Sequence, residues 1–417
     1  MKIGYACKTL GINAIPGYRT CTTKTYNEAL IYEIIEHNLR VLQDTLKYNL
    51  ENDILMFRIS SDIIPLASHP INNFNWQDVF KQQLTAIGTF VKSHRMRVSM
   101  HPGQYTIINS PNSDVVERAI LDLEYHCNFL DSLGLERTHK LILHIGGVYN
   151  DKDAAMSRFI TNYDKLPDCV KSRLIIENDD RLFTIADVLN ISKQRNIPVV
   201  FDNLHHHINP SSTHSEHEWI IQSVKTWRRE DGAPKLHYSN QNPHKRIGAH
   251  SEYIYIDEFM RFYEQVKDLN VDIMLEVKDK NLSAIKCIQC TNNYSINTYL
   301  VEWAKYKYVI LERNHNVYLQ IREYLKDNAN FNSKQFYLLI ESGLKGVPNH
   351  GSYRNGFDHV WSYFRKVATD KEKQAYKNKL AAFHNGKLKA SSIKKYLYTL
   401  AIKYERDYLL DSYYFDM

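Results

Sequence analysis

The stretches Arg173-Leu-Ile-Ile-Glu-Asn and Pro198-Val-Val-Phe-Asp-Asn are two short apolar runs, and each closes with a carboxylate and an asparagine. Similar runs of four to six residues recur along the first 300 residues, with helix-like amphipathic segments between them. Their length and their β-branched residues predict strands. The eight runs start at Ile3, Leu55, Arg97, Lys140, Arg173, Pro198, Pro234 and Asp272.

Eight strands that alternate with helices over about 280 residues predict an α/β fold, the (β/α)8 or TIM barrel. A doubly wound open sheet is the alternative, but it more often has a Gly-rich turn after the first strand, and Gly4-Tyr-Ala-Cys-Lys-Thr is not such a turn. From Asn292 the pattern changes to long helical periods rich in Tyr and Lys. We therefore expect a barrel domain over residues 1–291 and a smaller, all-α domain over residues 292–417.

Histidines and carboxylates mark the predicted strand ends, which is where a barrel of this kind builds its site. The third to the eighth strands all end on such a residue, namely His101, His144, Glu177, Asp202, His237 and Glu276. Three further histidines lie in the loops that follow strands, namely His69, His205 and His250. A hydrogen-bonded polar residue would explain any one position, but six in succession indicate a metal site.

The mixture of side chains at these positions suggests the chemistry. Neutral imidazoles with three carboxylates and no cysteine suit Zn, Mn, Fe or Co better than a thiolate zinc site or an all-oxygen magnesium site. Nine candidate ligands exceed what one tetrahedral ion needs, so two or three divalent ions are expected, with Glu177 as a bridge. Such clusters suit phosphodiester hydrolysis.

Charge and composition bound the class of protein. The chain has 417 residues, 19 histidines and a formal net charge of +6. Residues 1–300 carry a net charge of −2 and residues 301–417 a net charge of +8, so the basic excess lies in the tail and favours a polyanion partner. We expect a cytoplasmic protein without a membrane span, because the sequence shows neither a secretory signal nor an apolar run of about 18 residues.

Seven segments resemble the UV damage endonuclease family, a relative of endonuclease IV, over residues 1 to about 290. They are His101-Pro-Gly-Gln-Tyr, Leu143-His-Ile-Gly-Gly, Ile176-Glu-Asn-Asp, Phe201-Asp-Asn-Leu-His-His, Lys235-Leu-His-Tyr-Ser, Gly248-Ala-His-Ser-Glu-Tyr and Met274-Leu-Glu-Val-Lys-Asp-Lys. The resemblance implies a DNA repair enzyme that nicks double-stranded DNA 5′ to UV photoproducts and some other lesions, leaving a 3′-hydroxyl and a 5′-phosphate. It implies a cluster of divalent ions, usually Mn²⁺, and we expect association with the nucleoid while the enzyme repairs DNA. The mixture of ligands leaves Zn²⁺ and Co²⁺ as alternatives.

The resemblance also implies roles for single residues. The metal ligands would be His69, His101, His144, Glu177, Asp202, His205, His237, His250 and Glu276. Glu177, Glu276 and His237 would also serve catalysis, together with Lys235, which matches a lysine that is carboxylated near the metals. Gln104 and Tyr105 match a pair that probes the lesion, and Tyr5 matches a rim residue close to the damaged site.

Two further predictions concern DNA and the tail. Lys245 and Arg246 lie in the loop after the seventh strand, where they are candidates for a phosphate contact, with a solvated loop as the equally open alternative. The run from Tyr306 onward, including Asn355-Gly-Phe-Asp-His-Val-Trp, resembles the uncharacterised YbgA-type helical domain. Its helical spacing and its charge permit DNA binding or docking onto the barrel.

Three alternatives to UV-lesion incision stay open at this point. One is an endonuclease IV-like enzyme for abasic sites, and another is a sugar isomerase or epimerase on the same barrel. A DNA-binding descendant without catalysis is disfavoured, because every proposed ligand is present. We expect a monomer, and the sequence does not identify any protein partner.

Overall fold

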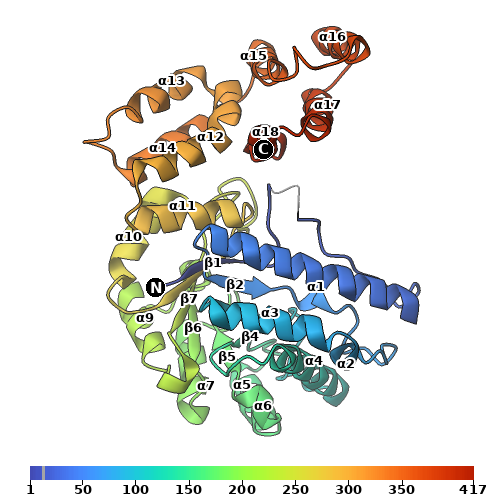
Figure 1. The fold of residues 1–417 in the computed structure, drawn as a ribbon. Coiled ribbons are helices and arrows are strands. Elements are labelled where there is room, and N and C mark those ends of the chain that lie inside the picture. The colour runs from blue at the N-terminus through green and yellow to red at the C-terminus, as the bar shows by residue number, and fades with distance from the viewer. Residues whose placement is uncertain (12–14) are drawn as a thin grey trace. The chain divides into compact units, whose positions relative to one another are not determined.

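The computed structural model of the protein describes residues 1–11 and 15–417. Its eight strands form one closed barrel in which each strand runs parallel to its neighbours, and β8 closes on β1 (Figure 1). The strands are β1 (Ile3–Ala6), β2 (Met56–Ile59), β3 (Arg97–Met100), β4 (Leu141–His144), β5 (Leu174–Glu177), β6 (Val199–Asp202), β7 (Lys235–Tyr238) and β8 (Asp272–Leu275). The predicted (β/α)8 barrel is confirmed.

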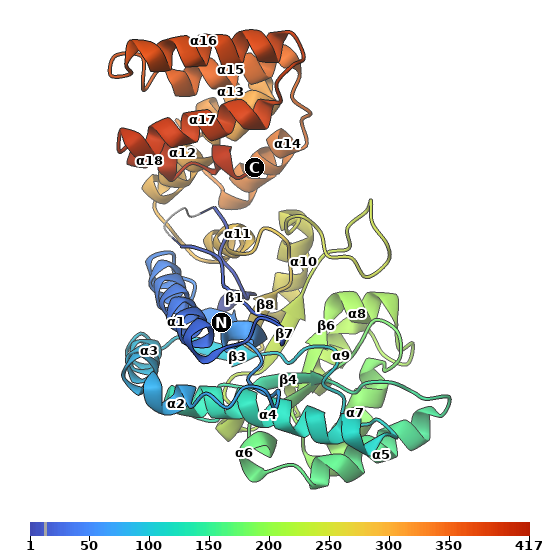
Figure 2. The ribbon, with the colours of Figure 1, turned by 90° about the vertical axis from the view of Figure 1, so that its right-hand side faces the viewer.

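Helices surround the barrel and connect its strands (Figure 2). They are α1 (Glu28–Glu51), α2 (Trp76–Val79), α3 (Lys81–Ser93), α4 (Ser113–Ser132), α5 (Lys152–Asp164), α6 (Asp168–Lys171), α7 (Ile185–Arg195), α8 (Asn203–Ile208), α9 (Glu216–Val224), α10 (Ile256–Val266) and α11 (Asn281–Thr291). Side-chain caps start several of them: Asn27 accepts a hydrogen bond from the Leu30 N–H of α1, and Thr184 and Asp187 form a capping box at α7.

Alternate residues of each strand face the inside of the barrel, because successive side chains of a strand point to opposite sides. Ala6, Met56 and Met274 form one buried cluster, and Ile142, Ile175 and Val200 form another. Two residues further along the strands come Arg58, His144, Glu177, Asp202 and Glu276. The inner apolar layer therefore supports a polar layer at the carboxyl ends of the strands, which we call the barrel mouth.

The chain divides into two compact units. The first holds most of residues 1–288, and the second holds Gln289–Met417 together with Tyr255–Glu258. The second unit contains α12 (Ile296–Arg313), α13 (His315–Tyr324), α14 (Ser333–Leu344), α15 (His350–Trp361), α16 (Asp370–His384), α17 (Ala390–Lys403) and α18 (Asp407–Leu410). The predicted all-α region after the barrel is confirmed, and its boundary after residue 291 stays a prediction. None of the described helices is both long and apolar enough to cross a lipid bilayer.

Candidate metal centre

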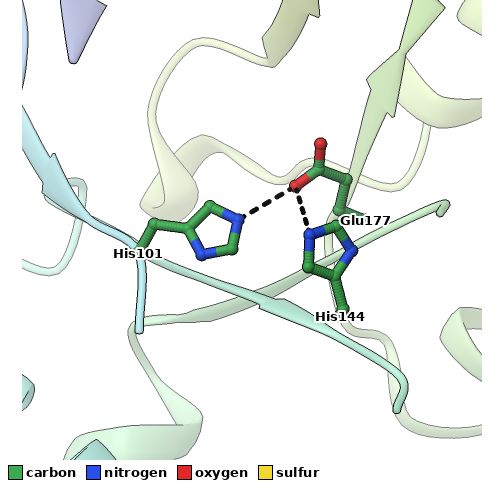
Figure 3. A group of neighbouring side chains, drawn as sticks. All are labelled: His101, His144 and Glu177. Carbon is green, nitrogen blue, oxygen red and sulfur yellow. Dashed lines mark hydrogen bonds and ion pairs between the residues drawn. The ribbon is translucent and has the colours of Figure 1, made fainter. Parts of the chain in front are cut away.

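Glu177 lies at the centre of the barrel mouth, where its fully buried carboxylate meets four imidazoles. Oε2 lies 3.3 Å from Nε2 of His101 and 3.8 Å from Nε2 of His144 (Figure 3). Oε1 lies 2.8 Å from Nδ1 of His237 and 3.7 Å from Nδ1 of His205. These side chains come from β4, β5 and β7, from the end of β3 and from α8, so closure of the barrel is what brings them together.

Asp202 ends β6 and also caps the helix that follows it. Its Oδ1 accepts a hydrogen bond of 2.8 Å from the backbone N–H of His205, which starts α8 directly at the strand end. His205 thus stays beside Asp202, with its Nδ1 2.9 Å from the carbonyl oxygen of Asn178. A histidine that donates one ring N–H to a backbone carbonyl keeps the other nitrogen oriented for a metal.

Glu276 forms a second carboxylate centre beside Glu177. Its oxygens lie 3.4 Å from Nδ1 of His237 and 3.8 Å from Nε2 of His250. The guanidinium of Arg58, on the inner side of β2, also forms a largely buried ion pair with Glu276. Sequence reasoning missed Arg58. It is the one charged residue in its strand run, and the alternation of inward residues along β2 would have placed it at the mouth.

Electrostatic effects differ among these groups. Although burial opposes ionisation of Glu177, His237 and the other imidazoles hold its pKa well below the ordinary value. Burial lowers the pKa of His144 to about 4 and raises the pKa of Asp202 to about 6. Burial disfavours the imidazolium of His205 as well, but Asp202 and the two glutamates raise its pKa to about 9. The mouth therefore holds several closely spaced anionic carboxylates, whose negative charge is partly compensated by Arg58 and by the protonated His205.

Several buried atoms at the mouth have no hydrogen-bond partner within the described chain, which is expected of atoms that ligate a metal. They include Oδ2 of Asp202 and Nε2 of His237. Two sets of side chains have ligand atoms close enough to share an ion: His101, His144 and Glu177, and Glu177, Asp202 and His237. The residues present thus fit a metal cluster of imidazole nitrogens and carboxylate oxygens, with Glu177 common to both sets.

Two other predicted residues lie differently. His69 is exposed in the loop after β2, and its Nδ1 accepts a hydrogen bond of 3.1 Å from the N–H of Ile71. Within the described residues, His69 forms no ion pair with the carboxylates at the mouth, so its role as a ligand stays a prediction. Lys235 lies inside the barrel, one layer below His237, and its fully buried Nζ has no hydrogen-bond partner among the described residues. Burial, with Arg97 nearby, lowers its pKa well below the ordinary value.

The predicted lesion-probing pair is exposed beside the cluster. Gln104 and Tyr105 follow directly on His101-Pro-Gly, and Tyr105 is 68% exposed, which is unusual for so large an aromatic side chain. The Tyr105 ring covers Gly103, where a Cβ atom would lie 2.5 Å from Cε1 of the ring. Glycine at this position therefore allows the ring to fold back over the turn.

Tyr5 does not lie at the rim. It is fully buried, and its hydroxyl donates a hydrogen bond of 2.7 Å to Oδ1 of Asn49 in α1. The prediction of a rim position was wrong in its geometry, because Gly4 and Ala6 occupy the inward positions of β1 and Tyr5 must point outward. Lys245 and Arg246 are exposed, as expected, and Lys245 forms an ion pair of 2.7 Å with Glu252.

A cavity of about 650 Å³ opens beside the cluster. Its lining includes His101, Gln104, His144, Arg181, His205 and Arg246. The cavity thus joins candidate metal ligands, one half of the probing pair and two arginines in a single polar hollow.

Comparison with known proteins agrees with this geometry. Residues 1–304 match the sequence model of the family described as UV-endonuclease UvdE. The chain belongs to this family. Residues 307–417 match a second family, described as a protein of unknown function (DUF1722).

Individual UvdE relatives support the assignment. A UV DNA damage endonuclease of Clostridium perfringens is 47% identical over 389 residues, which cover 89% of this chain and 93% of that protein. A UV DNA damage endonuclease of Bacillus cereus strain B4264 is 35% identical over 268 residues, or 64% of this chain and 84% of that protein. The crystal structure of SacUVDE is 40% identical, with a TM-score of 0.66, and the match covers 69% of this chain and 97% of that chain. The predicted family is confirmed, and the protein is an endonuclease.

Proposed function

We propose that the protein repairs DNA by cutting the phosphodiester bond immediately 5′ to UV photoproducts in duplex DNA, leaving a 3′-hydroxyl and a 5′-phosphate. Membership of the UvdE family and the names of the relatives support the reaction class. The observation that carries the proposal is the contact of Glu177 with four imidazoles, beside the exposed Gln104 and Tyr105. A centre suited to phosphate chemistry thus adjoins side chains suited to reading a base pair.

The ligands of the proposed cluster are the residues whose nitrogens and oxygens converge on Glu177 and Glu276, and His69 is included from the family resemblance. We propose Mn²⁺ as the ion, in two or three positions, with Zn²⁺ and Co²⁺ as alternatives. Bound divalent ions would supply Lewis acidity for the scissile phosphate and would ease the deprotonation of water. Glu177, Glu276 and His237 orient the groups of this centre, because each contacts at least one of the others.

The chain's own residues would bind and position the lesion. An exposed tyrosine ring and a carboxamide are able to replace the stacking and the hydrogen bonds that a distorted base pair loses. Opening a duplex costs a few kcal/mol, and less at a damaged pair, so such a probe discriminates in favour of lesions. Arg246, at the edge of the cavity, would contact a phosphate.

Lys235 has the properties of a lysine that reacts with carbon dioxide. Its amine is fully buried, has no hydrogen-bond partner among the described residues and has a strongly lowered pKa. The neutral nitrogen would form a bond to the carbon of CO₂ and release one proton, which yields a carbamate with two oxygens. We propose that this carbamate lies beneath the metal cluster, as the family resemblance implies.

An incision assay with Mn²⁺ on UV-irradiated, abasic and intact duplexes tests the function. We expect cleavage of the irradiated duplex on the 5′ side of the photoproduct. Cleavage of the abasic strand alone would favour an endonuclease IV-like enzyme. Cleavage of none of the three by the metal-loaded protein would overturn the proposal and would return a sugar isomerase or epimerase to consideration.

A further inference from the structure

The helices α16 and α17 and the turn between them carry almost all of the net charge of the second compact unit. Residues 370–403 contain nine lysines, no arginine and only two acidic residues, so their net charge is +7. The rest of residues 289–417 has a net charge of +1. The two helices pack against each other within this unit (Figure 2). The basic character of the tail is therefore a property of one helical pair, which we call the lysine hairpin.

The acidic residues of the lysine hairpin are already in use. Asp370 lies 3.3 Å from Nζ of Lys373, one turn along α16. Glu372 accepts hydrogen bonds from Lys403 and from the hydroxyl of Tyr404, and in doing so ties the start of α16 to the end of α17. Neither carboxylate is free to neutralise the remaining lysines.

Among the described residues, four of the nine lysines have an ion-pair or aromatic partner and five have none. Besides Lys373 and Lys403, Lys394 forms an ion pair of 2.8 Å with the buried Glu312, and Nζ of Lys379 lies 5.3 Å from the centre of the Tyr396 ring. The other five are exposed and form no ion pair with any described residue. They are Lys371, Lys377, Lys387, Lys389 and Lys395.

The fold presents these five lysines on a rigid support. α16 buries Tyr376, Leu380 and Phe383, and α17 buries Ile393, Leu397 and Leu400. Lys377 and Lys395 lie on the solvent faces of the two helices, whereas Lys387 and Lys389 lie in the turn that joins them. A partner thus meets several fixed positive charges at little cost in backbone ordering.

We propose that the lysine hairpin is a second DNA-binding surface, which holds the sugar–phosphate backbone without reading its sequence. The choice of DNA among polyanions rests on the proposed function of the barrel, whereas the binding surface itself does not. Lysine meets phosphate as a point charge, and the planar fork of arginine, which suits paired contacts with guanine, is missing from the segment. Duplex DNA offers one negative charge per about 1.7 Å, and each phosphate that a lysine neutralises releases counterions.

A salt titration of binding to an undamaged 30-base-pair duplex, with the full chain and with EDTA present, tests the proposal. The logarithm of the binding constant falls with the logarithm of the salt concentration by about 0.9 per phosphate contact. The triple variant Lys377→Gln, Lys387→Gln, Lys389→Gln should therefore reduce the slope by about 3. The matched control is Arg322→Gln, Lys326→Gln, Lys345→Gln, which removes the same charge from exposed positions elsewhere in the helical unit and should change the slope by less than about 1.

Equal slopes for the two triple variants would overturn the proposal, and so would salt-independent binding of the unaltered chain to the duplex. If the hairpin variant loses affinity for single-stranded RNA of the same length but keeps its affinity for the duplex, the partner is RNA and the proposal is wrong. Circular dichroism and a thermal melt verify that both variants fold, as expected for exposed lysines. This assay measures binding and not incision. Its result can therefore be interpreted even if the proposed nuclease function is wrong. If incision is observed, the hairpin variant should raise KM and leave kcat unchanged.

Discussion

Replacement of Arg58 by alanine tests how the barrel mouth balances its charge. Arg58 forms an ion pair with Glu276, and the two side chains are only 14% and 12% exposed. Removing one partner of a buried pair costs roughly 3–5 kcal/mol, because the other charge stays buried and uncompensated. We take about 3 kcal/mol, at the low end of that range, since both groups retain some contact with solvent. For a barrel of this size that corresponds to a fall in melting temperature of about 6 °C for the metal-free protein.

The pH dependence of this deficit follows from the pKa of Glu276. Arg58, the strongest of the neighbouring charges, holds that pKa well below its ordinary value against the effect of burial. A lowered pKa in the folded protein gives stability that is present above the unfolded value of about 4.3 and is lost as the pH falls through the folded value. The difference in free energy of unfolding between the unaltered protein and Arg58→Ala should therefore have its full value at pH 7 and should shrink below about pH 4.

Added Mn²⁺ separates a role at the mouth from a merely structural one. Removing a cation beside Glu276 makes the site more anionic, so the variant should bind Mn²⁺ more tightly and should gain more stability from it. Arg97→Ala is the matched control, because Arg97 forms a buried ion pair of 2.8 Å with Asp272 at the opposite end of the barrel. Melting curves with and without Mn²⁺ provide the readout. The reasoning would be refuted if Mn²⁺ raised the melting temperature of both variants equally. It would also be refuted if the stability lost in Arg58→Ala were the same at pH 3.5 and pH 7.

Other predictions address the site directly. His101→Ala should abolish incision of irradiated DNA, because it removes an imidazole from the Glu177 group, and measurable cutting would argue against its role as a ligand. Tyr105→Ala should lower the preference for irradiated over intact duplex and leave metal binding intact; an unchanged preference would show that the exposed ring is not the probe. Because the pKa of His205 is raised to about 9, a metal that binds its imidazole at pH 7 must displace a proton. The apparent affinity for the metal should then rise about tenfold per pH unit between pH 6.5 and 8.5. Calorimetry in two buffers should detect the release of about one proton on binding. Binding without proton release would contradict the assignment of His205 as a ligand.

The same sequence pattern, a short apolar run that ends in a polar residue, predicted both the barrel and its candidate ligands. A strand of a parallel barrel is buried on both sides and therefore reads as a short apolar run, and the first polar residue after the run marks the mouth. Glu177 and Asp202 both follow such runs, and the barrel brings their ligand atoms together with those of His237. His69 has no such anchor, because it lies in a loop whose path is not set by strand pairing.

The sequence by itself determined the order of strands and helices, the positions of the strand ends and the basic character of the tail. These features are local, since they depend on the period of apolar residues and on the identity of the next residue along the chain. Only the tertiary structure decided which way each side chain faces and which distant groups meet. Tyr5 turned outward towards α1 and Arg58 inward towards Glu276, because the register of the closed barrel sets the alternation of both strands. A contact across 218 residues, such as that between Arg58 and Glu276, exists only once the barrel has closed.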